Sequence, residues 1–241
     1  MTIAITAAAG SEIGNRYREN YDVQHLSLDP LLAIVADGMG DGPGSAMAGR
    51  TTVDTLVDRL RAEKPDATGI LDAVATASRL VVERGKEIAG LSGCTLTALI
   101  EGTDGFWITQ LGDSRVYRLR AGVLELLTVD HTMAWLGAVH GWYPFDSEQA
   151  AAARYQLIRC VGDRTIPDPD LMRIAPRPGD VFLLCTDGVA EQVSFYQIRE
   201  TLMGQATPDV MVESLLAAAN AAGGKDNASA IVIAVGEGDP S

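Results

Sequence analysis

The chain has 241 residues, of which 47% are hydrophobic and 21% are charged, and its formal net charge at pH 7 is −13. This length and composition predict a single globular domain spanning residues 1–241, with a substantial apolar core. The negative charge argues against nucleic acid or an anionic membrane surface as the main partner, because both repel an acidic protein.

Membrane insertion and export are not predicted either. No apolar stretch approaches the roughly 18 residues that a membrane-spanning helix needs, and MTIAITAAAG at the start lacks a basic signal-peptide region. Cys94, Cys160 and Cys185 form no CxxC pair, which is typical of reduced thiols and disfavours a zinc site. We therefore expect a cytoplasmic protein.

In chain order, the first half predicts strands followed by two helices. Residues 3–9 favour an edge strand, 10–22 a polar loop, and 31–36 a buried strand that leads into a glycine-rich loop. Apolar residues at i, i+3, i+4 and i+7 predict a helix over 45–63, and similar spacing predicts another over 69–88. The two helices are expected to pack antiparallel in one layer.

The second half is strand-rich and ends in two helices and a final strand. Asp104-Gly105 and Ala121-Gly122 each separate two short apolar runs, which predicts two hairpins forming one antiparallel meander behind the helices. Residues 130–160 are interpreted as an excursion with a short helix near 146–155. The remaining predicted elements are a strand over 181–185, helices over about 194–203 and 208–222, and a last strand over 230–235.

Four aspartates stand at the edges of these buried strands: Asp37, Asp113, Asp187 and Asp226. A buried carboxylate is costly unless a positive charge pairs with it, and the neighbouring glycines let backbone carbonyls approach a ligand. Without His or Cys clusters, the pattern favours Mg²⁺ or Mn²⁺ held by oxygen ligands. The alternative for each aspartate is a simple turn, as predicted for Asp104. Calcium-loop, Walker and GxSxG motifs are missing from the sequence.

An ordered set of motifs carries a family resemblance. The chain resembles bacterial metal-dependent Ser/Thr protein phosphatases of the type 2C class over about residues 14–235. The motifs are VADGMG (35–40), GCTLTA (93–98), GDSRVY (112–117), LTVDHT (127–132), PGDVFLLCTDGV (178–189) and KDNASAIVI (225–233). The resemblance implies an α+β fold, an α-β-β-α sandwich of two central antiparallel sheets between helical layers.

The resemblance also implies a centre with two Mn²⁺ or Mg²⁺ ions and a weaker third. A hydroxide bridging two cations would attack phosphorus in line with the leaving oxygen, without a covalent intermediate. By their motif positions, Asp37 matches the bridging carboxylate and the Gly38 carbonyl a ligand of the first metal. The other matches are Asp187 and Asp226 for the second metal, Asp113 with Asp187 for the third, and Asp22 for metal-bound water.

The N-terminal motif, residues 14–22, departs from the family pattern. Tyr21 stands where an acidic residue is usual, which puts one outer contact in doubt. The phosphate-binding arginine is predicted to be Arg18 or Arg16, with Arg18 slightly favoured, although counting along the motif lands on Tyr17. The alternative for either arginine is a solvated loop charge.

Three further features bear on substrate and proton transfer. Met39 stands where eukaryotic members have a histidine, so we expect water to protonate the leaving group. His131 is interpreted as structural. Residues 133–158 match the family's flap over the active site in position but not in sequence, so substrate preference cannot be inherited.

The predicted function is hydrolysis of phosphoserine and phosphothreonine in proteins. The expected partners are Ser/Thr kinases and their substrates in a bacterial-type signalling pathway, and the expected state is a monomer. One alternative is a catalytically weak member that binds phosphoproteins as a regulatory module. Another is a phosphatase dedicated to one anti-sigma-factor antagonist.

Overall fold

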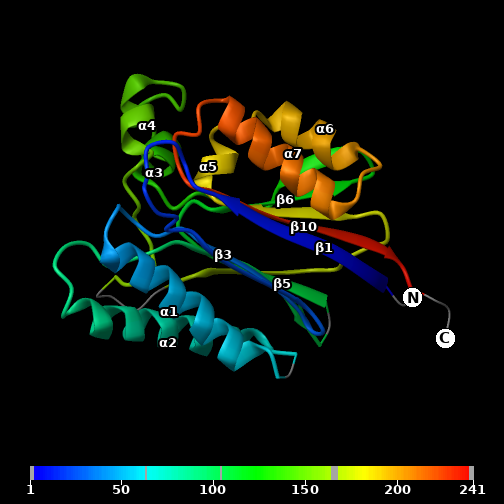
Figure 1. Ribbon diagram of the computed structural model, residues 1–241, viewed down its shortest axis with the longest axis horizontal. Coiled ribbons are helices and arrows are strands. Elements are labelled where there is room, and N and C mark those ends of the chain that lie inside the picture. The colour runs from blue at the N-terminus through cyan, green and yellow to red at the C-terminus, as the bar shows by residue number, and fades with distance from the viewer. Residues whose placement is uncertain (1–2, 63, 104, 164–167, 239–241) are drawn as a thin grey trace.

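The computed structural model describes residues 3–62, 64–103, 105–163 and 168–238. Its strands form two five-stranded antiparallel sheets that face each other, and helices cover both outer faces (Figure 1). This is the α-β-β-α sandwich, an α+β fold, that the family resemblance implies. Within the described residues, no helix has the length and apolar character to cross a membrane.

Every neighbouring pair of strands in both sheets is antiparallel. The first sheet has the spatial order β1 (Ile3–Glu12), β10 (Ala228–Glu237), β9 (Val181–Cys185), β6 (Arg115–Arg120) and β7 (Val123–Leu126). The second has the order β2 (Val23–Leu28), β3 (Leu31–Ala36), β4 (Leu96–Gly102), β5 (Gly105–Leu111) and β8 (Asp170–Ile174). The expected edge strand at the N-terminus is β1, three residues longer than predicted.

The alternation of side chains along β3 explains the layers. Leu32 and Ile34 point outward and pack with the two long helices, whereas Leu31 and Val35 point inward and pack between the sheets. Successive strand residues face opposite sides of a sheet, so a strand with both faces covered reads as a continuous apolar run. The first sheet likewise has an inner core and an outer core under its own helices.

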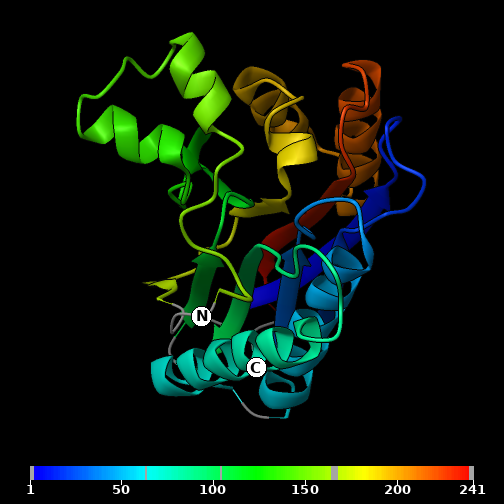
Figure 2. The ribbon, with the colours of Figure 1, turned by 90° about the vertical axis from the view of Figure 1, so that its left-hand side faces the viewer.

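The helices form two outer layers and a separate projection. The second sheet is covered by α1 (Pro43–Leu60) and α2 (Ala67–Gly85), which pack side by side as predicted. The first sheet is covered by α5 (Asp187–Ala190), α6 (Phe195–Met203) and α7 (Pro208–Ala221). Two short helices, α3 (Met133–Val139) and α4 (Glu148–Ala153), stand away from the sheets (Figure 2).

The predicted single meander is wrong. The β4–β5 hairpin belongs to the second sheet and the β6–β7 hairpin to the first. The chain crosses between them at Gly112, whose φ of +104° is a conformation that a residue with a side chain rarely adopts. Local turn signals identify each hairpin but carry no information about which sheet it joins. Asp104 of the first hairpin lies outside the described residues.

Four short elements were not predicted. Two are β2 and β8, which lie at the edges of the second sheet, and two are the helices α3, of seven residues, and α5, of four. The burial of β2 is intermediate along most of its length, so it lacks the apolar run that identified β3. The side chain of Thr132 caps α3 by accepting a hydrogen bond from the Trp135 amide.

Candidate active site

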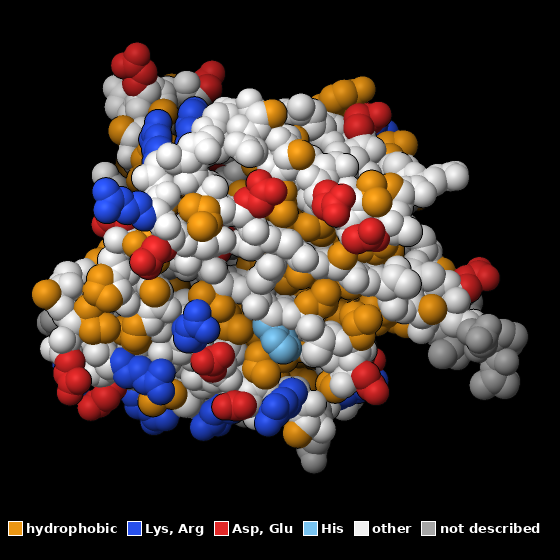
Figure 3. All heavy atoms as spheres, in the orientation of Figure 1, with side chains coloured by type: hydrophobic (Ala, Val, Ile, Leu, Met, Phe, Trp, Pro, Cys, Tyr) orange, Lys and Arg blue, Asp and Glu red, His pale blue; other side chains and the backbone are white. Residues whose placement is uncertain are grey.

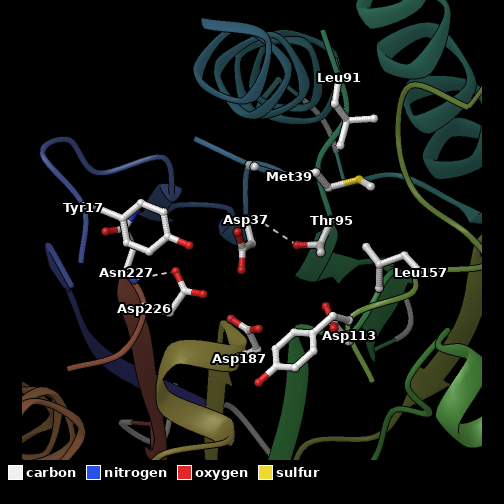
Figure 4. Close-up of a pocket in the computed structure, with 13 residues that line it drawn as sticks. Tyr17, Asp37, Met39, Leu91, Thr95, Asp113, Leu157, Asp187, Asp226 and Asn227 are labelled. Carbon is white, nitrogen blue, oxygen red and sulfur yellow. Dashed lines mark hydrogen bonds between the residues drawn. The ribbon is translucent and has the colours of Figure 1, made fainter. Parts of the chain in front are cut away.

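A cavity of about 250 Å³ opens where several loops meet at the ends of the two sheets. Four aspartate side chains, from both sheets, line it and point toward one another (Figure 4). They are Asp37 after β3, Asp113 between β5 and β6, Asp187 after β9, and Asp226 before β10. The other lining residues are Tyr17, Gly38, Met39, Gly40, Leu91, Thr95, Tyr155, Leu157 and Asn227.

The backbone of Asp37 is held in place by Thr95. The Asp37 amide donates to Thr95 Oγ1 at 2.9 Å, and the Thr95 amide donates to the Asp37 carbonyl at 2.8 Å. Thr95 Oγ1 also shares a 2.8 Å hydrogen bond with Ser114 Oγ. The GCTLTA and GDSRVY motifs therefore position the first aspartate as well as their own residues, and this role was not predicted.

Asp187 is the first residue of the short helix α5 and does not lie at the strand end itself. The next residue, Gly188, lies against the loop before β10. A Cβ atom added there would stand 1.9 Å from the Asn227 carbonyl oxygen, so only glycine permits this approach. The contact brings Asp187 beside Asp226 although the two are far apart in the chain.

The N-terminal loop closes the other side of the Asp226 loop. The Gly14 amide donates to Asn227 Oδ1 at 3.0 Å, and the Asn15 amide donates to the Gly224 carbonyl at 2.7 Å. The Asn227 amide in turn donates to Asp226 Oδ1 at 2.8 Å, which orients that carboxylate. Residues 14–17 thereby become part of the site.

Asp113 follows the crossing point at Gly112, and His131 braces that crossing. The Gly112 amide donates to His131 Nδ1 at 3.1 Å, and His131 Nε2 lies 3.2 Å from Asp170 Oδ2. His131 is buried and does not line the cavity. These contacts agree with the predicted structural role of His131.

Asp22 lies behind the cavity wall and is buried. Its Oδ2 accepts hydrogen bonds from Thr186 Oγ1 at 2.9 Å and Ser229 Oγ at 2.8 Å. Its Oδ1 is buried without a partner, and so is Oδ1 of Asp187. Buried acceptors are nearly always satisfied, so these two oxygens point to a missing cation or water.

The carboxylates repel one another in a poorly solvated site. Burial, followed by the charges of Asp22 and Asp187, raises the pKa of Asp37 well above its usual value. Burial and the Asp226 charge raise the pKa of Asp187 to about 6. Burial raises the pKa of Asp22 to about 7, with the Ser229 and Thr186 hydroxyls opposing the shift. Burial and Asp187 also raise the pKa of Asp113.

These residues fit a hard-cation site. The donors are carboxylates and backbone carbonyls, which Mg²⁺ and Mn²⁺ prefer, and no Lys or Arg is found among the described lining residues. In the described part of the chain, no three Asp, Glu, His or Cys side chains are already gathered around one point as a metal cluster. Mg²⁺ keeps several waters when it binds, so water would complete such a coordination shell.

The N-terminal motif places a tyrosine, and neither arginine, in the cavity. The side chains of Arg16 and Arg18 are exposed and do not line the cavity, although the Arg16 charge acts on Asp226. Tyr17 lines it and hydrogen-bonds to the Asp226 carboxyl group. Tyr21 donates from its hydroxyl to the Asp41 carbonyl at 2.8 Å.

Comparison with known proteins identifies the family of this chain. The protein phosphatase 2C model matches residues 16–222. This chain belongs to the protein phosphatase 2C family. The bacterial type 2C resemblance carried by the motifs is therefore confirmed.

Individual relatives of this phosphatase 2C chain are bacterial. It is 30% identical over 240 residues to the serine/threonine protein phosphatase PstP of Mycobacterium tuberculosis, covering 96% of this chain and 45% of PstP. The chain thus spans about half the length of that curated relative.

Solved structures share the fold. The PPM Ser-Thr phosphatase MsPP of Mycobacterium smegmatis, in complex with cacodylate, aligns with a TM-score of 0.83 at 32% identity, over 95% of this chain and 97% of that one. The catalytic domain of PstP in complex with two manganese ions aligns at 0.86 and 26% identity, over 98% and 100%.

Proposed function

We propose that this chain is a metal-dependent phosphatase that hydrolyses phosphoserine and phosphothreonine in proteins, with residues 1–241 as one catalytic domain. Membership of the protein phosphatase 2C family supports the reaction class. The observation that carries the proposal is the convergence of four aspartates around one cavity, with no Lys or Arg among the described lining residues. Such a site needs cations before it can accept a phosphate dianion.

The proposed ligand set follows the predicted one. Asp37 would bridge two Mn²⁺ or Mg²⁺ ions, and the carbonyl of Gly38, a residue that also lines the cavity, would be a ligand of the first ion. Asp187 and Asp226 would hold the second ion, and Asp113 with Asp187 a weaker third. Asp22 is the candidate for holding a metal-bound water through its unpartnered Oδ1.

The chemistry would divide between the cations and the protein. When bound, two divalent cations supply the Lewis acidity that makes water nucleophilic near neutral pH. The protein holds the carboxylates in place before substrate arrives, through Thr95 at Asp37, Gly188 at Asp187 and the Asn227 amide at Asp226. The Thr95 hydroxyl in the cavity is already engaged by the Asp37 amide and Ser114, so it is not free to act as a nucleophile.

The phosphate-binding arginine remains a prediction. Arg16 or Arg18 would have to turn from the exposed loop surface toward the cavity to meet a phosphate. The proposed macromolecular substrates are phosphoproteins, with kinases and their targets as partners, and the chain is expected to act as a monomer.

The second candidate function is a catalytically weak phosphoprotein-binding module. Two observations favour it. Uncharged Tyr17 lines the cavity, and Tyr21 stands where the family pattern has an acidic residue. Hydrolysis of a small aryl phosphate with and without Mn²⁺ separates the two. The phosphatase predicts Mn²⁺-dependent turnover that EDTA abolishes, whereas the binding module predicts retention of a phosphopeptide without turnover.

A further inference from the structure

The active-site cavity offers few protein groups that can donate a hydrogen bond to a phosphate. Its described lining contains no Lys, Arg or His side chain. The donors that remain are the hydroxyls of Thr95, Tyr17 and Tyr155 and the side-chain amide of Asn227, besides backbone amides. A phosphate bound here would therefore be contacted by one of these groups in addition to any cation.

Three of these donors already have partners within the protein. The Tyr17 hydroxyl hydrogen-bonds to the Asp226 carboxyl group, so its single O–H would have to turn from Asp226 to a phosphate. Thr95 Oγ1 accepts from the Asp37 amide and shares a hydrogen bond with Ser114 Oγ. Asn227 accepts from the Gly14 amide through Oδ1 and donates to the Glu19 carbonyl through Nδ2 at 3.3 Å. Freeing Thr95 or Asn227 would release the backbone of a metal-ligand loop, whereas the Tyr17 hydroxyl is bonded only to a side chain.

The two tyrosines differ in position. Tyr155 belongs to the segment 133–158, which carries the projecting helices α3 and α4, and it is 76% exposed. Tyr17 is half-buried, and its ring lies beside Asp226 with the hydroxyl directed into the cavity (Figure 4). Its loop is tied down by the Asn15–Gly224 hydrogen bond, and its ring packs edge-on against Tyr21 at 6.2 Å. Tyr17 is therefore the preorganised hydroxyl of the site.

We propose that the Tyr17 hydroxyl donates a hydrogen bond to the phosphoryl oxygens of the bound phosphomonoester and of the phosphate product, where the motif pattern predicts an arginine. This inference rests on the proposed phosphatase function. A phenol is a neutral donor, so its attraction for a phosphate dianion is weaker than that of a bidentate guanidinium. Phosphate held by Tyr17 is consequently released more readily than phosphate held by arginine.

The test is equilibrium binding of inorganic phosphate to the Mn²⁺-saturated full chain, measured by calorimetry. Tyr17→Phe removes only the hydroxyl and should weaken phosphate binding about tenfold, the usual effect of losing one hydrogen bond to a charged group. Tyr17→Arg should tighten it beyond wild type. Tyr196→Phe is the matched control, since Tyr196 is 67% exposed on α6 and away from the cavity.

Two further measurements separate the contact from a structural role at Asp226. If Tyr17 only orients Asp226, Tyr17→Phe will weaken Mn²⁺ binding while phosphate affinity at saturating Mn²⁺ stays at the wild-type value, and the proposal is then wrong. Arg16→Gln and Arg18→Gln test the two arginines as alternative donors; a tenfold loss of phosphate affinity in either, with none in Tyr17→Phe, would overturn the proposal.

Kinetics provide an independent check. Tyr17→Phe should raise the KM for an aryl phosphate and the inhibition constant of phosphate together, because both ligands carry the same group. Failure of the wild-type protein to turn over aryl phosphate would count against the proposed function alone, since phosphate binding reports on Tyr17 without turnover.

Discussion

Each candidate ligand depends on a neighbour that lets two chain segments approach closely. Gly188 lies against the Asn227 carbonyl, and a Cβ at Gly14 would stand 2.4 Å from the Asp226 backbone. Side-chain hydroxyls then provide orientation, as Thr95 does for Asp37. Substituting these neighbours would disturb the site without removing a carboxylate.

Asp187→Asn should nearly abolish phosphatase activity and leave the fold intact. The amide keeps the shape of the side chain but removes the negative charge that offsets a cation, and losing one preorganised electrostatic group costs about 10²–10³ in rate. Mn²⁺-dependent turnover of an aryl phosphate measures the effect, with circular dichroism as the folding control. A folded variant retaining more than about a tenth of the wild-type rate would mean that the active centre lies elsewhere.

Asp113→Ala should remove the weak metal site and spare the two tight ones. Asp113 approaches the cavity from the Gly112 crossing, on the side away from Asp226 (Figure 4). Titration of the metal-free protein with Mn²⁺ counts the sites, and Asp209→Ala on the exposed first turn of α7 serves as control. Unchanged weak-site binding in Asp113→Ala would refute the assignment.

At the scale of elements, the segment 133–158 joins the site to the projecting helices α3 and α4. Tyr155 and Leu157 from this segment line the cavity. Arg154 approaches Glu191 at the end of α5, with Nε and Oε1 3.4 Å apart. The helices themselves are held together by aromatic contacts such as Trp135 against Phe145, at 6.3 Å between ring centroids. The segment is thus supported mainly by its own contacts and by a few at the cavity rim.

Replacing residues 133–158 with a short Gly-Ser linker should impair hydrolysis of a phosphoprotein far more than that of an aryl phosphate. A small substrate needs only the carboxylate cavity, whereas a protein must also lie against the projecting segment. Parallel assays on both substrates measure the difference, and the aryl phosphate rate is the internal control. Equal losses on both would assign the segment to the metal centre instead of substrate binding.

For the same segment, we predict greater mobility than for the rest of the site. Its glycines at 137 and 141 and Pro144 break any long periodicity. Hydrogen exchange should therefore be faster over 133–158 than over the β-strands that carry the aspartates. Protection equal to that of β3 would contradict this prediction.

At the scale of the whole molecule, acidic side chains are spread widely, and those in and behind the cavity cost the most folding free energy. Acidic side chains are scattered over the face in Figure 3, while the net charge is −13. Exposed carboxylates are solvated, whereas those of Asp37, Asp187 and Asp22 are poorly solvated and close together. Cations would relieve this repulsion, so metal binding and stability should be linked.

The metal-free protein should become less stable as the pH rises through the acid range. The pKa values of Asp22 and Asp187 are raised to about 7 and about 6, so the folded state holds protons that the unfolded state has already released. Stability therefore falls from about pH 4, the unfolded pKa, up to about pH 7. Burial lowers the pKa values of His131 and His25, and these two groups oppose the trend.

Thermal unfolding with EDTA at pH 5.5 and pH 8 tests this expectation. The melting temperature should be at least about 3 °C higher at pH 5.5. Saturating Mn²⁺ should reverse the order, and Asp187→Asn should reduce the difference in the metal-free protein. Equal stability of the metal-free protein at both pH values would contradict the repulsion argument.

Much of this protein is determined by its sequence. Apolar runs and helical spacing predicted the strands β3 and β9 and the helices α1, α2, α6 and α7, because burial requires those patterns. The aspartates beside glycines predicted a hard-cation site, because a buried carboxylate is costly unless a positive charge pairs with it.

Only the tertiary structure decided what depends on contacts between distant segments. It divided the two hairpins between two sheets, since a turn signal does not specify the sheet that a hairpin joins. It placed Asp187 at the start of α5 and Asp22 behind it, held by Thr186 and Ser229. It also put Tyr17 in the cavity with Arg16 and Arg18 outside, because the direction of a loop side chain follows from the packing of residues 14–17 against 224–227.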